Sequence, residues 1–288
     1  MGWYDAIKDG IAVAQKADNL PLVKDSLDAK QQIFELINEN QQLKDEIEKM
    51  DISGNVISGM HEALREFVKP GLTTMQVNDF CEKFIRSKGA IPAQIGFEGF
   101  PYATCCSVND EICHGYPSDY ILKSGDLLKV DTVVEFNGWM SDSCWSYSVG
   151  QIDEDTQKLM DVTRECLYEG IKLAVIGNRL GDIGAKIQSI AETNGYSVVR
   201  EFTGHGIGRG MHEDPMVLHY GKEHRGLRLQ EGMVLTIEPM INMGTHKLKI
   251  DKNGWTARTI DGKKSCQYEH TLAITKDGPR ILTKQQGQ

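Results

Sequence analysis

The 288-residue sequence lacks the features that mark membrane and secreted proteins. No stretch approaches the roughly 18 apolar residues of a membrane-spanning helix. The N-terminus has no basic region followed by an apolar core, as a secretory signal peptide has. The myristoylation pattern also fails, because position 6 is Ala6. We therefore expect no membrane association.

An excess of basic charge and paired cysteines are also absent. Lys and Arg total 32 against 41 Asp and Glu, so the net charge is −9, and no basic run stands out. An acidic protein repels phosphate backbones, so nucleic acid is not an expected partner. The seven cysteines show no C-x-x-C spacing. This pattern indicates reduced thiols in a cytoplasmic protein and argues against a disulfide framework.

What the sequence does contain is a strong hairpin signal, the dipeptide Asn137-Gly138. Two strand-like segments flank it: residues 127–135 and residues 139–149. If the dipeptide forms the loop, Asp131 faces Cys144 and Asp142 faces Val133. Both aspartates then point to one face with Cα atoms roughly 7–8 Å apart, a span that two cations can fill. The alternative is a pair of solvated aspartates on an exposed sheet face.

An internal repeat favours the first interpretation. Residues 71–89 and 177–195 each open with glycine, continue as a helical pattern and end at glycine, with an offset of 106 residues. Residues 122–131 and 229–238 each lead through an apolar strand to an acid, Asp131 and Glu238, with an offset of 107 residues. Matching halves that each deliver an acid predict a pseudo-two-fold α+β domain with its site on the axis. Chance similarity of short segments is the alternative.

Five further motifs follow in order along the chain: Ser107-Val108-Asn109-Asp110-Glu111-Ile112-Cys113-His114-Gly115, Gly204-His205-Gly206-Ile207-Gly208, Met211-His212-Glu213, Thr236-Ile237-Glu238-Pro239 and Tyr268-Glu269-His270-Thr271. Together with the aspartate hairpin, they closely resemble methionine aminopeptidases of the bacterial, type I kind. The resemblance covers about residues 44–288 and implies the pita-bread fold. In that fold, two αβ halves pack helices outside a curved, mostly antiparallel sheet. Here a small α-helical N-terminal extension would precede it.

The resemblance also implies a set of metal ligands: Asp131, Asp142, His205, Glu238 and Glu269. Four carboxylates and one imidazole suit two divalent cations and leave room for water and substrate, unlike thiolate-rich structural zinc sites. By the resemblance, Asp131 chelates one ion, while His205 and Glu238 hold the other. Asp142 and Glu269 then bridge both ions. Mn, Fe, Co and Zn all tolerate such ligands, so the sequence does not name the metal.

The activity that the resemblance implies is removal of the N-terminal methionine from nascent polypeptides whose second residue is small. A metal-activated water would attack the first peptide bond, and Glu238 would accept its proton. One metal would also hold the free α-amine, which explains exopeptidase action. His114 and His212 resemble the histidines that contact the peptide and stabilise the tetrahedral intermediate.

A methionine pocket is implied by the same resemblance: Phe97, Phe100, Cys105, Met211 and Trp255. Bacterial members more often carry tyrosine at the first two of these positions and phenylalanine at that of Met211. The departures keep the pocket apolar, so we still expect selectivity for methionine. For each of these apolar residues, ordinary core packing is the alternative.

The other histidines match no useful motif. We expect His61, His219, His224 and His246 to be ordinary surface residues. His270 follows Glu269 directly, so on a strand its side chain is expected to face away from the metals.

Residues 1–43 form a predicted extension before a catalytic domain of residues 44–288. Trp3, Ile7, Ile11 and Ala14 make a helical stripe, and Asn19-Leu20-Pro21 marks a stop and a new helix start. Heptad spacing is then present at Ile33, Leu36, Asn40, Leu43, Ile47 and Met50, which is typical of a short dimeric coiled coil. The catalytic core would claim the last two residues and leave fewer than two heptads. We therefore favour a helical hairpin or an arm that docks on the ribosome or another protein. A monomer is expected, with a dimer through the extension as the alternative.

Two other functions remain open at this point. The first is another pita-bread peptidase, such as a prolidase or an enzyme like aminopeptidase P. Those enzymes usually carry a large N-terminal domain, which 43 residues cannot supply. The second is a non-enzymatic peptide-binding protein with the same fold, which the presence of all the ligand types argues against.

Overall fold

The structure is a computed structural model that describes residues 20–286. The chain divides into two compact units, residues 1–47 and residues 48–288, and helix α2 (Leu20–Phe67) contributes to both. This helix begins at the predicted start, with Pro21 in its first turn, where proline is tolerated. The predicted stripe of Trp3, Ile7, Ile11 and Ala14 lies outside the described residues. Helix α2 is continuous through residues 43 and 44, and the predicted division there stays a proposal.

The second unit contains three more α-helices and a 3-10 turn: α3 (Thr74–Ser87), α4 (Glu154–Lys172), α5 (Leu180–Thr193) and η1 (Phe97–Gly99). A capping box starts α3, in which Thr73 accepts from the backbone of Gln76 and the Gln76 side chain accepts from the backbone of Thr73. The first and last residues of α3 and α5 are both 106 positions apart. The predicted repeat is therefore present as a pair of equivalent helices.

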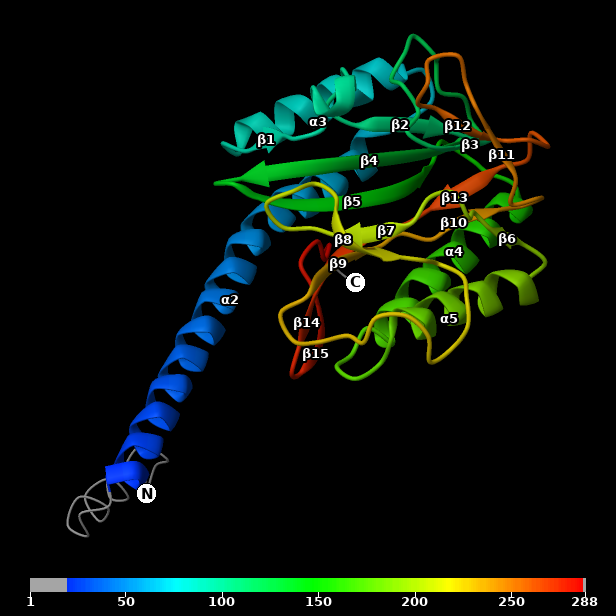
Figure 1. Ribbon diagram of the computed structural model, residues 1–288. Helices are drawn as coiled ribbons and strands as arrows, with labels where there is room; N and C mark the ends of the chain where they lie inside the picture. The colour runs from blue at the N-terminus through cyan, green and yellow to red at the C-terminus, as the bar shows by residue number, and fades with distance from the viewer. Residues whose placement is uncertain (1–19, 287–288) are drawn as a thin grey trace. The chain divides into compact units, whose positions relative to one another are not determined.

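The strands are short apart from one long pair (Figure 1). Their bounds are β1 (Ile91–Pro92), β2 (Cys105–Val108), β3 (Glu111–Cys113), β4 (Leu127–Phe136), β5 (Trp139–Ser148), β6 (Ser197–Val198), β7 (Gly204–Gly206), β8 (Glu213–Val217), β9 (Val234–Ile237), β10 (Met240–Asn242), β11 (Leu248–Ile250), β12 (Ala257–Thr259), β13 (Ser265–Gln267), β14 (His270–Thr275) and β15 (Gly278–Ile281). Within residues 20–286, all strand pairings are antiparallel. The α+β class is as predicted.

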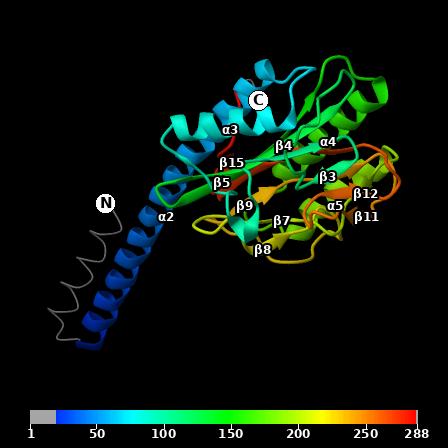
Figure 2. The same cartoon turned by 90° about the horizontal axis from the view of Figure 1, so that it is seen from above.

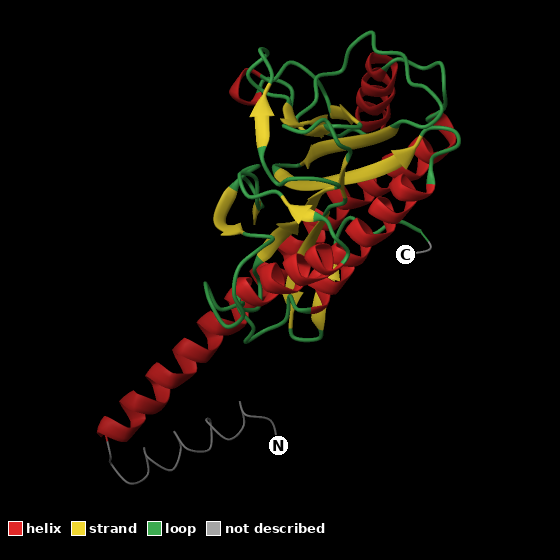
Figure 3. Cartoon of the chain, turned by 90° about the vertical axis from the view of Figure 1, so that its right-hand side faces the viewer, coloured by secondary structure: helices red, strands yellow, loops and turns green. Residues whose placement is uncertain are grey.

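Four sheets result. Strand β4 pairs with β5 along one edge and with β1 and β2 along the other. The order β15-β14-β9-β7-β8 makes a second sheet, and β13-β10-β6 and β11-β12-β3 make two small ones. Helix α3 lies beside β1 and β2 (Figure 1). Helix α4 packs on α5 (Figure 2) and on β13. Within the second unit, most of the helical ribbon lies to one side of the strands (Figure 3).

The hairpin has the predicted register. Asn137 and Gly138 have φ of 51° and 80°, the left-handed values that a tight two-residue turn needs. Asp131 pairs with Cys144, and Val133 pairs with Asp142. Both aspartates therefore face the same side of the β4–β5 ribbon.

The core of the second unit lies between its helices and its strands. Met60 and Leu64 of α2, Cys81 of α3 and Leu167 of α4 are all buried in one apolar cluster. Helices and strands that are far apart in the sequence contact one another in this cluster. The cluster therefore fixes the strands whose ends carry the predicted site residues. Within the part of the chain that the structure describes, no helix combines the length and apolarity of a bilayer-crossing segment.

Candidate metal centre

Every side chain predicted for the site lines one cavity of about 560 Å³. These side chains are Phe97, Phe100, Cys105, His114, Asp131, Asp142, His205, Met211, His212, Glu238, Trp255 and Glu269. They come from strands and loops of both halves of the repeat. The structure thus brings the predicted residues together, although the role of each stays a prediction.

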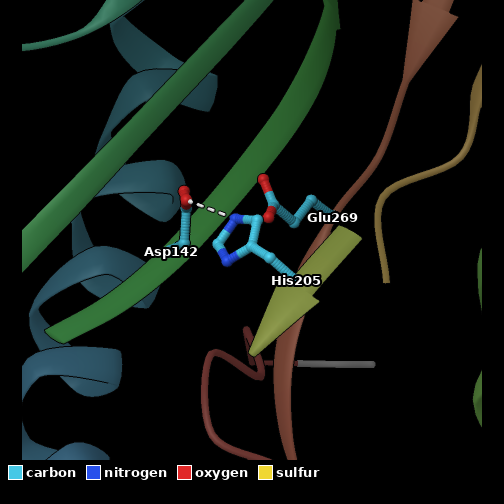
Figure 4. Close-up of side chains that lie close together, drawn as sticks. All are labelled: Asp142, His205 and Glu269. Carbon is cyan, nitrogen blue, oxygen red and sulfur yellow. Dashed lines mark ion pairs between the residues drawn. The ribbon is translucent and has the colours of Figure 1, made fainter. Parts of the chain in front are cut away.

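Three of the predicted ligands form a tight group in which one ligand atom of each lies within 4.8 Å of the others: Asp142, His205 and Glu269. Asp142 extends from β5, His205 from β7, and Glu269 from the segment between β13 and β14 (Figure 4). His205 Nε2 lies 3.7 Å from Asp142 Oδ2. Backbone bonds hold this arrangement, since Glu269 N donates to Cys144 O at 2.9 Å.

The other two predicted ligands border this group. Glu238 follows the end of β9, and its Oε1 lies 3.6 Å from His205 Nε2. Asp131 lies on β4, and its carboxyl group is close enough to that of Asp142 to share a hydrogen bond. Four carboxyl groups and one imidazole therefore face a common space.

The electrostatics of this group suit divalent cations. Burial raises the pKa of Asp131 to about 7. Burial, and then the neighbouring charges of Asp131 and Glu238, raise the pKa of Asp142 well above its usual value. Burial, and then the charges of Asp142 and Glu238, raise the pKa of Glu269 in the same way. Asp142 Oδ1 and Glu269 Oε1 are buried and have no hydrogen-bond partner within residues 20–286. A cation would give these oxygens a partner and offset the repulsion, so the donor set fits a metal.

His205 is oriented as a metal ligand needs to be. Its Nδ1 lies 2.9 Å from Gly206 O, so Nδ1 carries the proton and Nε2 presents a lone pair to the carboxylates. Burial lowers the pKa of His205 to about 4, which keeps the ring neutral near pH 7. Gly206 is required here because a Cβ at this position would lie 2.2 Å from Asp214 O. The glycine beside the histidine therefore allows β7 and β8 to approach closely.

Sequence reasoning missed a layer of side chains that hold the predicted ligands. Thr236 Oγ1 donates to Glu238 Oε1 at 2.9 Å and accepts from His205 N at 3.0 Å. Gln267 Nε2 lies 3.4 Å from Glu238 Oε2, and His219 Nε2 accepts from Glu238 N at 3.1 Å. Thr236 lies in the Thr236-Ile237-Glu238-Pro239 motif, two residues before Glu238, so the motif could have identified it. Gln267 and His219 carry no local signal.

Two of the expected surface histidines are in fact buried. His61 has no exposed surface, and its ring contacts the Tyr147 hydroxyl and Ser143 O. His219 is 1% exposed. The prediction was wrong for both because burial here is set by contacts with distant segments. His270 faces away from the ligand group as predicted, since its Nδ1 lies 2.9 Å from Thr283 Oγ1 and its Nε2 lies 3.2 Å from the Tyr168 hydroxyl.

His114 and His212 lie at the cavity wall with aromatic neighbours. His114 follows β3 with a φ of 54°. Its ring packs edge to face on that of Phe202, with the ring centroids 5.1 Å apart. The centroid of the His212 ring lies 4.5 Å from that of the His205 ring and 5.2 Å from that of the Phe97 ring. Burial lowers the pKa of both histidines, that of His114 to about 4. Each ring is therefore neutral near pH 7 and has one N–H to donate.

The apolar wall beside the ligand group consists of the predicted pocket residues. Phe100 packs edge to face on Trp255 at 5.1 Å. Phe100, Cys105 and Met211 are buried, and Cys105 pairs with Asp131 across β2 and β4. The apolar wall and the carboxylates therefore share one cavity.

Comparisons with known proteins agree with this geometry. Residues 48–276 match metallopeptidase family M24. A methionine aminopeptidase from Bacillus subtilis is 45% identical over 232 residues, covering 81% of this chain and 94% of the relative. One from Clostridium perfringens is 46% identical, covering 86% of this chain and 98% of the relative.

Solved structures give the same result. The crystal structure of methionine aminopeptidase from Rickettsia prowazekii has a TM-score of 0.83 and 43% identity, covering 84% of this chain and 98% of that chain. A prolidase from Pyrococcus furiosus has a TM-score of 0.69 at 23% identity, which shows a shared fold alone. The predicted pita-bread fold is confirmed by these matches. The chain therefore belongs to metallopeptidase family M24 and, within it, to the methionine aminopeptidases of the bacterial, type I kind.

Proposed function

We propose that this metal-dependent hydrolase removes the N-terminal methionine from nascent polypeptides whose second residue is small. The observation that carries the proposal is a single cavity in which four carboxyl groups and a neutral imidazole adjoin an apolar wall. The relatives at 45% and 46% identity are methionine aminopeptidases, which supports the same activity.

We assign the metal ligands to two divalent cations, of Mn, Fe, Co or Zn. Asp131 would chelate one ion, His205 and Glu238 the other, and Asp142 and Glu269 would bridge both. The support is the crowding of these buried groups and the two buried oxygens that have no hydrogen-bond partner within residues 20–286. Bound divalent metal supplies Lewis acidity, which lowers the pKa of water and polarises a carbonyl.

Glu238 is the proposed general base. Its carboxyl group lines the cavity. Thr236 donates a hydrogen bond to its Oε1, and Gln267 donates one to its Oε2. These contacts limit its rotation and hold one geometry for accepting a proton from the attacking water.

His114 and His212 are the proposed peptide contacts. Both rings are neutral near pH 7 because burial lowers their pKa, so each presents one N–H donor. A donor aimed at the carbonyl oxygen of the scissile bond stabilises the negative charge that develops there. The edge-to-face contacts with Phe202 and Phe97 restrict the two rings.

The proposed methionine pocket comprises Phe97, Phe100, Cys105, Met211 and Trp255. A thioether packs well against aromatic edges, and Phe100 and Trp255 provide them. Because the same cavity holds the ligand group, a side chain in this pocket would bring its own peptide bond next to Glu238 and His205.

A peptide panel tests the proposal. The full-length protein is incubated with Met-Gly-Met, Met-Pro and Gly-Pro and with Mn²⁺, Fe²⁺, Co²⁺ or Zn²⁺. We expect release of methionine from Met-Gly-Met. Cleavage of Gly-Pro alone would identify a prolidase, and no cleavage with any metal would favour a peptide-binding protein.

We further propose a reducing, cytoplasmic setting in which nascent chains are the substrate. The seven cysteines are all free and buried, which supports this setting. Residues 1–43 are proposed to be a helical hairpin or an arm for docking on the ribosome or another protein, with a dimeric coiled coil as the alternative. The heptad spacing supports a helical partner.

A further inference from the structure

Lys129 is a buried cation to which the proposed reaction assigns no role. Its side chain lies on β4 and is 1% exposed. Its Nζ donates to Asn109 O at 2.9 Å and to Ser265 O at 2.8 Å. Among residues 20–286, no carboxylate lies within ion-pair distance of this ammonium group. Burial of a cation without a paired anion is unfavourable, and it lowers the pKa of Lys129 to about 8, so the two carbonyl oxygens have to offset part of the lost hydration.

The two acceptors belong to segments that are far apart in the sequence. Asn109 lies in the turn between β2 and β3, with a φ of 52°, in the first half of the repeat. Ser265 is the first residue of β13, in the second half. Ser265 N also donates to Asn109 O, at 3.0 Å. The Lys129 amine therefore links three segments where the two halves of the repeat meet: β4, the turn between β2 and β3, and β13. These three segments are called the junction.

Both strands at this junction lead directly to predicted metal ligands. Along β4, Asp131 follows Lys129 by two residues, so the two side chains share a face. Beyond the start of β13 at Ser265, Gln267 contacts Glu238, and Glu269 follows two residues later. At about 3.3 Å per residue, the junction lies roughly 7 Å from Asp131 and 13 Å from Glu269 along the chain.

We propose that Lys129 is a positioning residue for the metal centre, whose two hydrogen bonds hold β13 against β4 and thereby set the separation of Glu269 and Glu238 from Asp131. The inference rests on the proposed metal ligands. A residue that only supported folding would contribute to stability and leave the affinity of the correctly folded protein for metal unchanged. The two roles therefore differ in a measurable way.

The test measures Co²⁺ binding to metal-free, full-length protein by calorimetric titration and by the visible absorption of the bound ion. Lys129→Met keeps the aliphatic chain and removes the donors. We expect its Co²⁺ affinity to fall at least about tenfold, in the range found for groups that orient ligands, and its absorption band to change. Lys129→Gln retains two N–H donors on a shorter chain, so its affinity is expected to lie between those of Lys129→Met and the wild type.

Lys264→Met is the matched control. Lys264 Nζ also donates to a backbone carbonyl, that of Gly125 at 3.1 Å, and to Thr156 Oγ1 at 2.6 Å. Thr156 lies in α4 and Gly125 in the turn before β4, and Lys264 Nζ also lies 3.4 Å from Asp153 Oδ2. None of these groups contacts a predicted metal ligand directly. We expect a lower melting temperature in this variant and a Co²⁺ affinity within about twofold of the wild type.

The outcomes separate cleanly. Wild-type Co²⁺ affinity in folded Lys129→Met would overturn the proposal, whatever its melting temperature. If that variant does not fold, Lys129→Leu, which also lacks the donors, decides, and wild-type affinity there would assign Lys129 to folding alone. Turnover of the peptide panel by the wild-type protein is scored separately, so a failure of the proposed function is not mistaken for a failure of this inference.

Discussion

Thr236→Val is the sharpest test of how the predicted ligands are held. Thr236 has no exposed surface, and its hydroxyl bridges Glu238 Oε1 and His205 N. Valine has nearly the same shape and removes the bridge without a large cavity. The hydrogen bond from Thr236 lowers the pKa of Glu238 against the upward effect of burial, so its loss favours the neutral acid, which is the weaker ligand and base.

The magnitude follows from the two contacts. Loss of a hydrogen bond to a charged group costs about 1.5–3 kcal/mol, and a buried N–H left without its partner, here that of His205, costs about 1–3 kcal/mol. We therefore expect the free energy of unfolding to fall by about 3–5 kcal/mol. A unit of this size has a melting temperature that shifts by roughly 2–4 °C per kcal/mol, which gives a decrease of about 6–20 °C. Metal affinity should fall about 10–100-fold.

The assays are calorimetric titration with Mn²⁺ at pH 7.5, turnover of Met-Gly-Met at saturating metal, and thermal unfolding. Thr163→Val is the matched control, because Thr163 is equally buried and its hydroxyl donates to Leu159 O within α4 at 2.7 Å. The control should lose stability and keep its metal affinity. Equal metal affinities in Thr236→Val, Thr163→Val and the wild type would refute the reasoning.

Other predictions concern the ligands, the histidines and pH. Asp142→Asn should abolish metal binding and activity, since the carboxylate proposed to bridge the two ions is lost. Retained turnover would count against the assignment. His212→Ala should leave the metal content, measured by elemental analysis, nearly intact and lower kcat by at least about tenfold, and equal metal loss in both variants would remove that distinction. The pKa of Asp131 is raised from 3.8 to about 7, so between about pH 4 and 7 the folded metal-free protein binds more protons than the unfolded chain. The free energy of unfolding of the metal-free protein should therefore decrease as pH rises through this window. Mn²⁺ affinity should increase over the same window and binding should release protons, which titration in buffers of different ionisation enthalpy detects. A flat profile would contradict the raised pKa of Asp131 as the cause. Removal of metal by a chelator should abolish turnover of Met-Gly-Met, and added Mn²⁺ or Co²⁺ should restore it; full activity in excess chelator would exclude a metal-dependent reaction.

Much of the site was predictable because its signals are local. Asn137-Gly138 set the register of the hairpin, and alternation along its strands placed Asp131 and Asp142 on one face. The repeat predicted a second acid at Glu238, which lines the same cavity. The order of the motifs added His205 and Glu269.

The groups that hold the ligands could not be predicted in this way. His219 and Gln267 contact Glu238 from positions 19 residues before it and 29 residues after it, and neither lies in a recognisable motif. Lys129 lies on a predicted strand, yet its two acceptors are 20 and 136 residues away in the sequence. Such contacts depend on how separate strands pack, and no local pattern encodes that packing.

Turn chemistry, strand alternation and the glycine beside His205 are properties of neighbouring residues, so the sequence by itself determined the elements and the faces that carry Asp131, Asp142 and His205. The tertiary structure alone decided that β5, β7 and the segment before β14 meet, with ligand atoms of Asp142, His205 and Glu269 within 4.8 Å of one another. It also decided the burial that shifts their pKa values and the layer of hydrogen bonds behind them. The reason is that burial and approach depend on the packing of the whole chain, whereas a turn depends on a few adjacent residues.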